Sequence, residues 1–226
     1  MGKNINLLEG PIFPSLSKLA LPIMATSFVQ MAYNLIDMLW IGKVGSSAVA
    51  AVGTAGMYPW FANGFASIAR MGGQVKTGHA LGAKREEEAI KLIESSLQLG
   101  SIMGVAYGVI AALFASPLIG FFNLNHVKVI ADAEIYMRLT GMGVVFSFVN
   151  TILSGIVTVM GNSRTAFRAT AIGLISNIIM DPLLIFGVGI FPRMRVAGAA
   201  IATVCAQVLV TVVFIISIYR EEGLFH

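Results

Sequence analysis

Six long apolar stretches constrain this chain more than any other feature of its sequence. They lie near residues 15–41, 47–70, 90–122, 132–160, 165–190 and 197–219. A helix that crosses a bilayer needs roughly 20 apolar residues, and each stretch provides that length. Only 12% of the residues are charged, whereas soluble domains contain about 25%. The sequence therefore predicts an all-α integral membrane protein with six transmembrane helices and no sizeable soluble domain.

Lysine and arginine are distributed unevenly between the two sides of these predicted spans. With the N-terminus in the cytoplasm, ten fall inside: Lys3, Lys18, Arg70, Lys76, Lys84, Arg85, Lys91, Arg164, Arg168 and Arg220. Five fall outside: Lys43, Lys128, Arg138, Arg193 and Arg195. The positive-inside rule then favours two cytoplasmic termini in a multi-pass protein of the cell (inner, cytoplasmic) membrane. No cluster of basic and aromatic residues indicates a nucleic-acid partner.

Two acidic residues lie deep within the predicted spans, Asp37 in the first and Asp181 in the fifth. A charge at the bilayer centre costs about 2.5–3.5 kcal/mol on insertion scales, so such groups usually face a cavity or a partner. No basic residue is expected at comparable depth in any span. The two acids therefore indicate protonation, a bound cation or a water-filled cavity.

Both acids have polar neighbours at helical spacing. Gln30, Tyr33, Asn34 and Asp37 follow one stripe of the first span, and Asn177 lies one turn before Asp181 in the fifth. Pro182 has no N–H for the carbonyl of residue 178, which leaves that oxygen free. A carboxylate, an amide oxygen and a free carbonyl are ligands suited to a sodium ion. The carboxylate could carry a proton instead.

Other features of the spans have structural as well as functional interpretations. Asn150, Gln207, Thr203 and Thr211 could line a site or only join helices by hydrogen bonds. Pro22 is expected to bend the first span as Pro182 bends the fifth. Glycines at 100, 104 and 108 share one face, which predicts close approach of another helix.

No motif in the chain indicates an enzyme. The glycine-rich GHALGAKR lacks the spacing of a phosphate-binding loop. The single cysteine, Cys205, indicates neither an internal disulfide nor a metal site. We expect no cofactor and no metal beyond a sodium ion.

Several segments resemble the N-terminal lobe of multidrug and toxic compound extrusion (MATE) transporters. They are LLEGPIFPSLSKLALPIM, NLIDMLWIGKVGSSAVAAVG, GHALGAKREEEA, GNSRTAF, NIIMDPLLIFGVG and VAGAAIATVCAQ. The resemblance implies one six-helix lobe over residues 1–226, without the second lobe of a twelve-helix family. It also implies export of cationic or amphipathic compounds in exchange for protons or sodium ions. The family's polar ion cluster would fall on Asp37, Asn150, Asn177, Asp181 and Thr203, with Pro22 as the bending proline.

The resemblance places the substrate cleft between two lobes, so one copy of this chain supplies half of it. Gln30, Tyr33, Asn34 and Gln207 are the candidates for lining the cleft. The chain could be a fragment of a longer transporter or a half-transporter that pairs as a parallel homodimer. Two alternative functions stay open: a flippase for lipid-linked saccharides, which would need more basic residues within the spans, and a non-transporting lobe.

Overall fold

The computed structural model describes residues 12–220 of the chain. Eight helices and no strand occur within these residues. The helices are α1 (Ile12–Val44), α2 (Ser46–Ala55), α3 (Met57–Gly82), α4 (Glu86–Leu113), α5 (Ala115–Gly120), α6 (Val127–Val159), α7 (Ser163–Phe186) and α8 (Val196–Arg220). The prediction of an all-α fold is confirmed. Lys3 and the start of the LLEGPIFPS motif lie outside the described residues.

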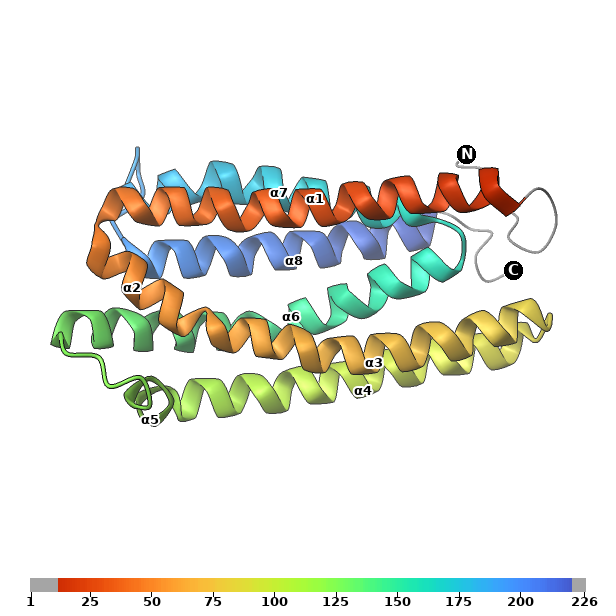
Figure 1. Ribbon diagram of the computed structural model, residues 1–226, viewed down its shortest axis with the longest axis horizontal. Helices are drawn as coiled ribbons and strands as arrows, with labels where there is room; N and C mark the ends of the chain where they lie inside the picture. The colour runs from red at the N-terminus through yellow and green to blue at the C-terminus, as the bar shows by residue number, and fades with distance from the viewer. Residues whose placement is uncertain (1–11, 221–226) are drawn as a thin grey trace.

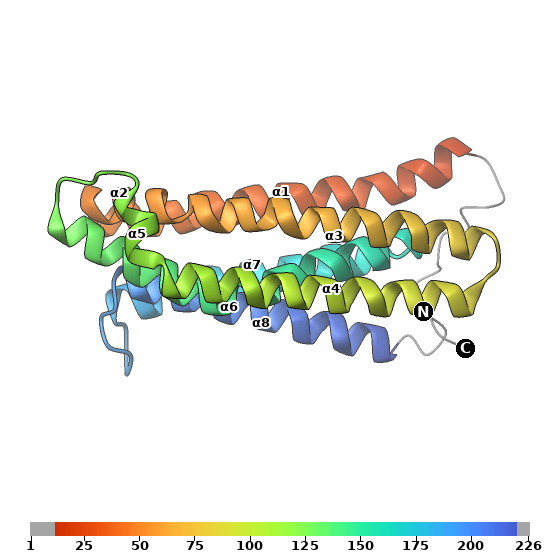
Figure 2. The ribbon, with the colours of Figure 1, turned by 90° about the horizontal axis from the view of Figure 1, so that it is seen from below.

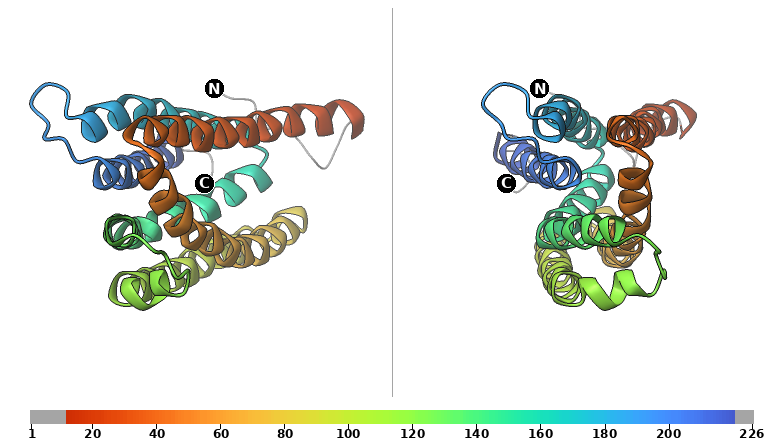
Figure 3. Two further views of the ribbon diagram at one scale, coloured as in Figure 1. Left: turned by 60° about the vertical axis from the view of Figure 1, so that its left-hand side comes forward. Right: turned by 90° about the vertical axis from the view of Figure 1, so that its left-hand side faces the viewer.

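Helix α6 is the centre of the bundle. It packs against α3, α4 and α8, and its side chains belong to all four clusters of buried apolar residues. Figure 3 shows α6 passing from the pair α3–α4 to the layer formed by α1, α7 and α8. The long helices alternate in direction, so α1 begins and α8 ends at the same end of the lobe (Figure 1).

The predicted second span, residues 47–70, is not a single apolar helix. The chain forms α2 up to Ala55 and then α3, which continues to Gly82. Pro59 lies in the first turn of α3 and has no N–H to bond the carbonyl of residue 55, which interrupts the helix there. Helix α3 also carries polar side chains along its length: Asn63, Ser67, Arg70, Gln74, Lys76, Thr77 and His79.

Five helices of the described part are long and apolar enough to cross a membrane: α1, α4, α6, α7 and α8. The predicted span at 90–122 is shorter than expected, since α4 ends at Leu113 and Pro117 lies in the separate short helix α5. The predicted span at 165–190 ends at Phe186, where Gly187 adopts a left-handed conformation (φ 72°) and caps α7. Glycine accepts that conformation without a Cβ clash, so it commonly ends helices.

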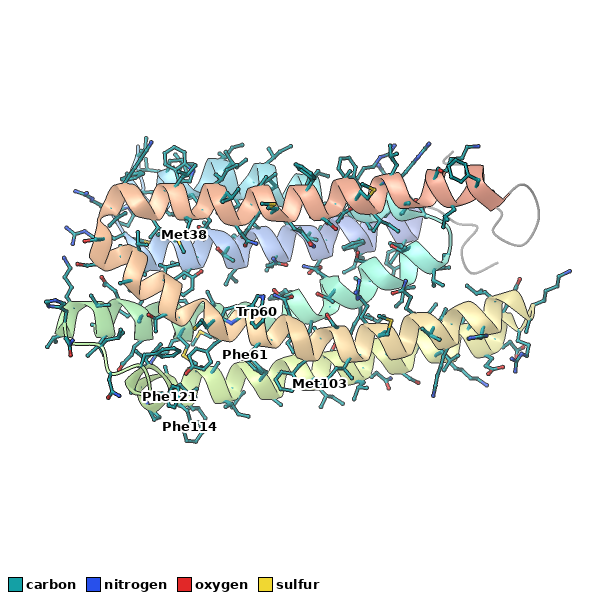
Figure 4. All side chains as sticks on the ribbon, viewed as in Figure 1. Met38, Trp60, Phe61, Met103, Phe114 and Phe121 are labelled. Carbon is teal, nitrogen blue, oxygen red and sulfur yellow. The ribbon has the colours of Figure 1, made fainter. Side chains whose placement is uncertain are left out.

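Large apolar side chains cover much of the outer surface. Trp60 and Phe61 on α3, and Phe114 and Phe121 beside α5, are each more than half exposed. Figure 4 shows them on the outside of the bundle. A water-soluble protein rarely exposes so many large apolar side chains, whereas the lipid-facing surface of a membrane protein consists of them. The surface therefore supports the membrane assignment independently of helix length.

The glycine row on α4 lies against α6, as its spacing predicts. A Cβ atom on Gly104 would lie 3.0 Å from the Cα of Val145, and one on Gly108 would lie 2.5 Å from the carbonyl oxygen of Gly141. These neighbours are backbone atoms, which cannot move aside as a flexible side chain can. The glycines therefore set the distance between α4 and α6.

We expect Gly108→Ala to destabilise the lobe by about 1–3 kcal/mol, the usual range for overpacking. The matched control is Gly72→Ala on α3, where no atom lies within 4 Å of the added methyl group. Thermal unfolding in detergent, followed by size-exclusion chromatography, measures both. Equal midpoints for the two variants would contradict the close-packing role of Gly108.

Candidate functional site

The two acids predicted to lie deep in the membrane face each other across two helices. Helix α1 packs along α7, which brings the carboxyl group of Asp37 within hydrogen-bonding reach of that of Asp181. Asp181 is fully buried. Asp37 Oδ1 and Asp181 Oδ2 are buried and have no hydrogen-bond donor among the described residues. Two carboxylates in this position repel each other unless a proton or a cation lies between them.

Asn177 joins the acid pair from α7. Its Nδ2 donates to Asp181 Oδ1 at 3.2 Å, as expected for side chains one helical turn apart. Its own Oδ1 is buried and has no donor among the described residues. Helix α7 continues through Pro182 to Phe186, so the carbonyl oxygen of Ile178 loses its usual partner inside an unbroken helix.

Three hydroxyl groups lie near the acids. Tyr33 of α1 and Thr203 of α8 lie near each other, and their hydroxyl oxygens are buried without a well-formed hydrogen bond in the described structure. Tyr136 of α6 is also close to Thr203 and lies within electrostatic range of both carboxyl groups. The structure thus brings together Asp37, Asn177, Asp181 and Thr203, as predicted, and adds the two tyrosines. We call these six residues the acid cluster.

Tyr136 is a member that sequence reasoning misses. It occupies a buried position in an apolar helix, where a tyrosine is usually interpreted as core. One signal was present: Tyr136 precedes Asn150 by fourteen residues, close to four helical turns, so both lie on the same face of α6.

Asn150 contacts α8 instead of the acids. Its Nδ2 donates to the backbone carbonyl and to the Oε1 of Gln207, both at 2.9 Å. Its Oδ1 accepts from the Thr211 hydroxyl at 2.8 Å. These bonds satisfy the amide and join α6 to α8. The structure supports a helix-joining role for Asn150, and its predicted role in ion binding stays a prediction.

A polar cavity of about 390 Å³ adjoins the acid cluster. Residues of α1, α3, α6, α7 and α8 line it. Figure 2 shows α1 and α3 on the same side of the lobe. The four cleft candidates Gln30, Tyr33, Asn34 and Gln207 all line it, as does Asn150. Tyr33 therefore belongs to both the cavity wall and the acid cluster.

Arg70 does not end its helix, as the predicted span at 47–70 has it. Helix α3 continues to Gly82, roughly 18 Å further along the helix axis. Arg70 instead lines the cavity, together with Asn63 and Ser67 of the same helix. Arg70 packs beside Gly155, about one turn before the end of α6, and the expectation that no basic residue lies at the depth of the two acids stays a prediction.

A lobe of lipid-facing helices with buried acids beside a polar cavity defines a multi-pass membrane transport protein. The family model described as MatE matches residues 22–183, and the chain belongs to this family of transporters, which are not enzymes. The resemblance seen in the sequence motifs is confirmed.

Relatives and solved structures agree with this assignment. The chain is 27% identical over 207 residues to a probable multidrug resistance protein NorM of Thermotoga maritima, covering 92% of this chain and 44% of the relative. It is 27% identical to an FAD transporter of Shewanella oneidensis, covering 87% and 43%. A crystal structure of MATE in complex with MaD5 superimposes with a TM-score of 0.88 at 26% identity, covering 98% and 50%.

A MOP superfamily transporter from Pyrococcus furiosus superimposes with a TM-score of 0.86 at 26% identity, covering 100% of this chain and 49% of that one. The chain thus spans about half the length of the relatives it matches. Its fold corresponds to one lobe of a MATE transporter.

Proposed function

We propose that this chain forms half of a secondary active transporter, which exports amphipathic small molecules in exchange for protons or sodium ions. The acid cluster is the coupling site, and the polar cavity is half of the substrate cleft. The observation that carries the proposal is the pairing of Asp37 with Asp181. Their inward oxygens, with those of Asn177, Tyr33 and Thr203, are buried and have no donor within residues 12–220.

Buried oxygens without donors are costly, each by about 1–3 kcal/mol. A proton shared by the carboxyl groups would relieve the acid pair. A sodium ion would satisfy more of the cluster, since hard cations prefer carboxylate, amide and hydroxyl oxygens. Either ion would draw α1, α7 and α8 together, because the oxygens come from these three helices.

This geometry supports alternating access. An ion can shift the equilibrium between two arrangements of the lobe only through a difference in its affinity for them. The acid cluster supplies such a difference when α1 moves relative to α7, because that movement separates Asp37 from Asp181. Pro22 and Pro182 lie in these two helices and are the candidate bending points.

Charge and the positions of the helix ends support one orientation of the lobe. We propose that α2 and α3 together form the second of six crossings, with both ends of the lobe in the cytoplasm of a cell-membrane protein. The tip between α3 and α4 carries Lys84 and Arg85. A cytoplasmic position for this tip agrees with the positive-inside rule.

Transport in proteoliposomes tests the proposal. The purified chain is reconstituted with ethidium or a fluorescent flavin inside, and a pH or sodium gradient is imposed. Export that accelerates with one of the gradients supports ion-coupled antiport. If folded protein exports the dye at the same rate with and without either gradient, the proposal of ion-coupled antiport is contradicted.

A second copy of the chain is the proposed partner. Because α1 begins and α8 ends at the same end of the lobe (Figure 1), two parallel copies can face each other across a two-fold axis. Each would cover the polar stripe of α1 that otherwise faces lipid. The sequence also fits a longer protein that carries its own second lobe.

Cross-linking distinguishes these arrangements. In a Cys205→Ala background, Asn34→Cys on the cavity side is expected to form disulfide dimers in membranes. Val109→Cys on the exposed side of α4 is the control and should not. Cross-linking at Val109 alone, or transport by a strictly monomeric 226-residue chain, would reject the homodimer.

A further inference from the structure

Arg70 is a charged side chain without a partner in the cavity wall. Its Nε is buried and has no hydrogen-bond acceptor among the described residues. The two ion pairs of the described structure, Arg85–Glu88 and Arg138–Glu134, do not involve it. The residue as a whole is half-buried, and an unpaired guanidinium that lines a cavity is a candidate for binding an anion.

The side chain is held in this wall by close packing. Its aliphatic stem crosses Gly155 of α6, where an added Cβ would lie 2.6 Å from the Cγ of Arg70. The same Cβ would lie 3.2 Å from Oε1 of Gln74, one turn further along α3. The absence of a side chain at residue 155 thus leaves room for the stem beside α6. This packing holds the stem of Arg70 against α6.

The rest of the cavity complements a molecule with one anionic end. Among the described residues that line it, Arg70 carries the one formal charge, and no carboxylate is present. Asn63, Ser67 and Arg70 follow one face of α3 and supply neutral polar groups beside the guanidinium. Val29, Leu174, Val210 and Phe214 form apolar parts of the wall. A guanidinium can bind a carboxylate or phosphate with two parallel hydrogen bonds.

We propose that Arg70 anchors the anionic group of the transported molecule, which is an amphipathic carboxylate or phosphate ester and not an organic cation. This inference rests on the proposed function of the cavity as half of a substrate cleft. It differs from the substrate charge expected from the family resemblance. It assigns the acid cluster to the coupling ion alone, since the acids lie outside the cavity wall.

Flavin mononucleotide and riboflavin are matched probes, because they share the ring system and differ by one phosphate group. The intact chain is placed in nanodiscs of phosphatidylcholine, and binding is followed by flavin fluorescence anisotropy. We expect flavin mononucleotide to bind about tenfold or more tightly than riboflavin, the usual effect of a hydrogen bond to a charged group. Ethidium, a cationic probe, should bind more weakly than flavin mononucleotide.

Arg70→Gln should remove the preference for flavin mononucleotide and leave riboflavin binding unchanged. Arg70→Lys keeps the charge and should retain part of the preference. Lys76→Gln, an exposed position on the same helix, is the control and should retain all of it. A thermal unfolding midpoint measured for each variant shows that the lobe is folded.

Nanodiscs containing phosphatidylglycerol separate a soluble anion from a lipid headgroup. If the headgroup of an anionic lipid occupies the site, phosphatidylglycerol should weaken flavin mononucleotide binding to the wild type but not to Arg70→Gln. If the site takes soluble anions, binding should be the same in both lipids. Both results support an anion site at Arg70, and they differ only in whether a lipid or a soluble molecule supplies the anion.

Equal binding of the two flavins by the folded wild type would overturn the inference, as would a preference that survives Arg70→Gln. Tighter binding of ethidium than of flavin mononucleotide would also overturn it. These results leave ion coupling untouched, because sodium or proton binding to the acid cluster is measured separately without a flavin. If the protein shows no ion coupling but still prefers flavin mononucleotide, the proposed antiport is rejected and the anion site at Arg70 is not.

Discussion

Replacing Asp37 or Asp181 with asparagine is expected to reduce ion-coupled export to the background rate of empty liposomes. Each carboxyl group supplies half of the proposed ion site, and an asparagine amide can neither release a proton nor balance a bound cation. The double variant should be no more defective than either single variant, because both remove the same function. Export under imposed pH and sodium gradients measures all three.

Although export is lost, the thermal stability of these variants should not fall. Removing one of two facing buried carboxylates relieves repulsion, so the unfolding midpoint in ion-free buffer should stay equal or rise. Asp132→Asn near the start of α6 is the matched control, since Asp132 lies outside the acid cluster. Wild-type export by both Asp37→Asn and Asp181→Asn would end the coupling-site hypothesis. A fall in stability without a change in coupling would show a purely structural pair.

Gly198→Ala is expected to have the largest effect on folding. A Cβ on Gly198 would lie 2.6 Å from both the carbonyl carbon and the carbonyl oxygen of Leu184, and 2.9 Å from the amide nitrogen of Ile185. All three are backbone atoms of α7, so α8 must move away from the end of that helix. We expect a loss of about 3 kcal/mol, at the upper end of overpacking penalties.

Gly53→Ala in α2 serves as the control, because nothing lies within 4 Å of the added methyl group there. Ion affinity adds a second measurement. Gly198 packs one turn beyond Asp181, so the displaced helix should also weaken sodium or proton binding in whatever fraction stays folded. A Gly198→Ala protein with the unfolding midpoint of Gly53→Ala would show that α8 does not depend on this contact.

The acid cluster could be largely predicted from sequence, because buried acids are conspicuous in apolar surroundings. Asp37 and Asp181 stand out in their spans, and helical periodicity places Asn177 beside Asp181. Pairing the two acids required the resemblance to a known family, since periodicity within one helix says nothing about which helix packs against it. Tyr136 could not be separated from ordinary core by its local sequence.

The misplaced end of the second span has a physical origin: a hydropathy pattern does not locate the end of a helix that continues through polar residues. Helix α3 extends to Gly82 through Gln74, Lys76 and Thr77, so Arg70 lies within the helix, where it lines the cavity, and not at its end. Asn150 shows a related limit. An amide in an apolar helix has the same sequence pattern whether it binds a ligand or joins α6 to α8.

Tyr33 has a consequence for energy transfer, because one side chain lines the cavity and touches the acid cluster. A ligand that displaces the Tyr33 ring changes the surroundings of both carboxyl groups and therefore their affinity for an ion. Thermodynamic linkage then requires the ion to change the ligand's affinity by the same factor. Exchange of cargo for ion within this lobe would therefore need no long-range signal, since the two binding equilibria meet at a single phenol ring.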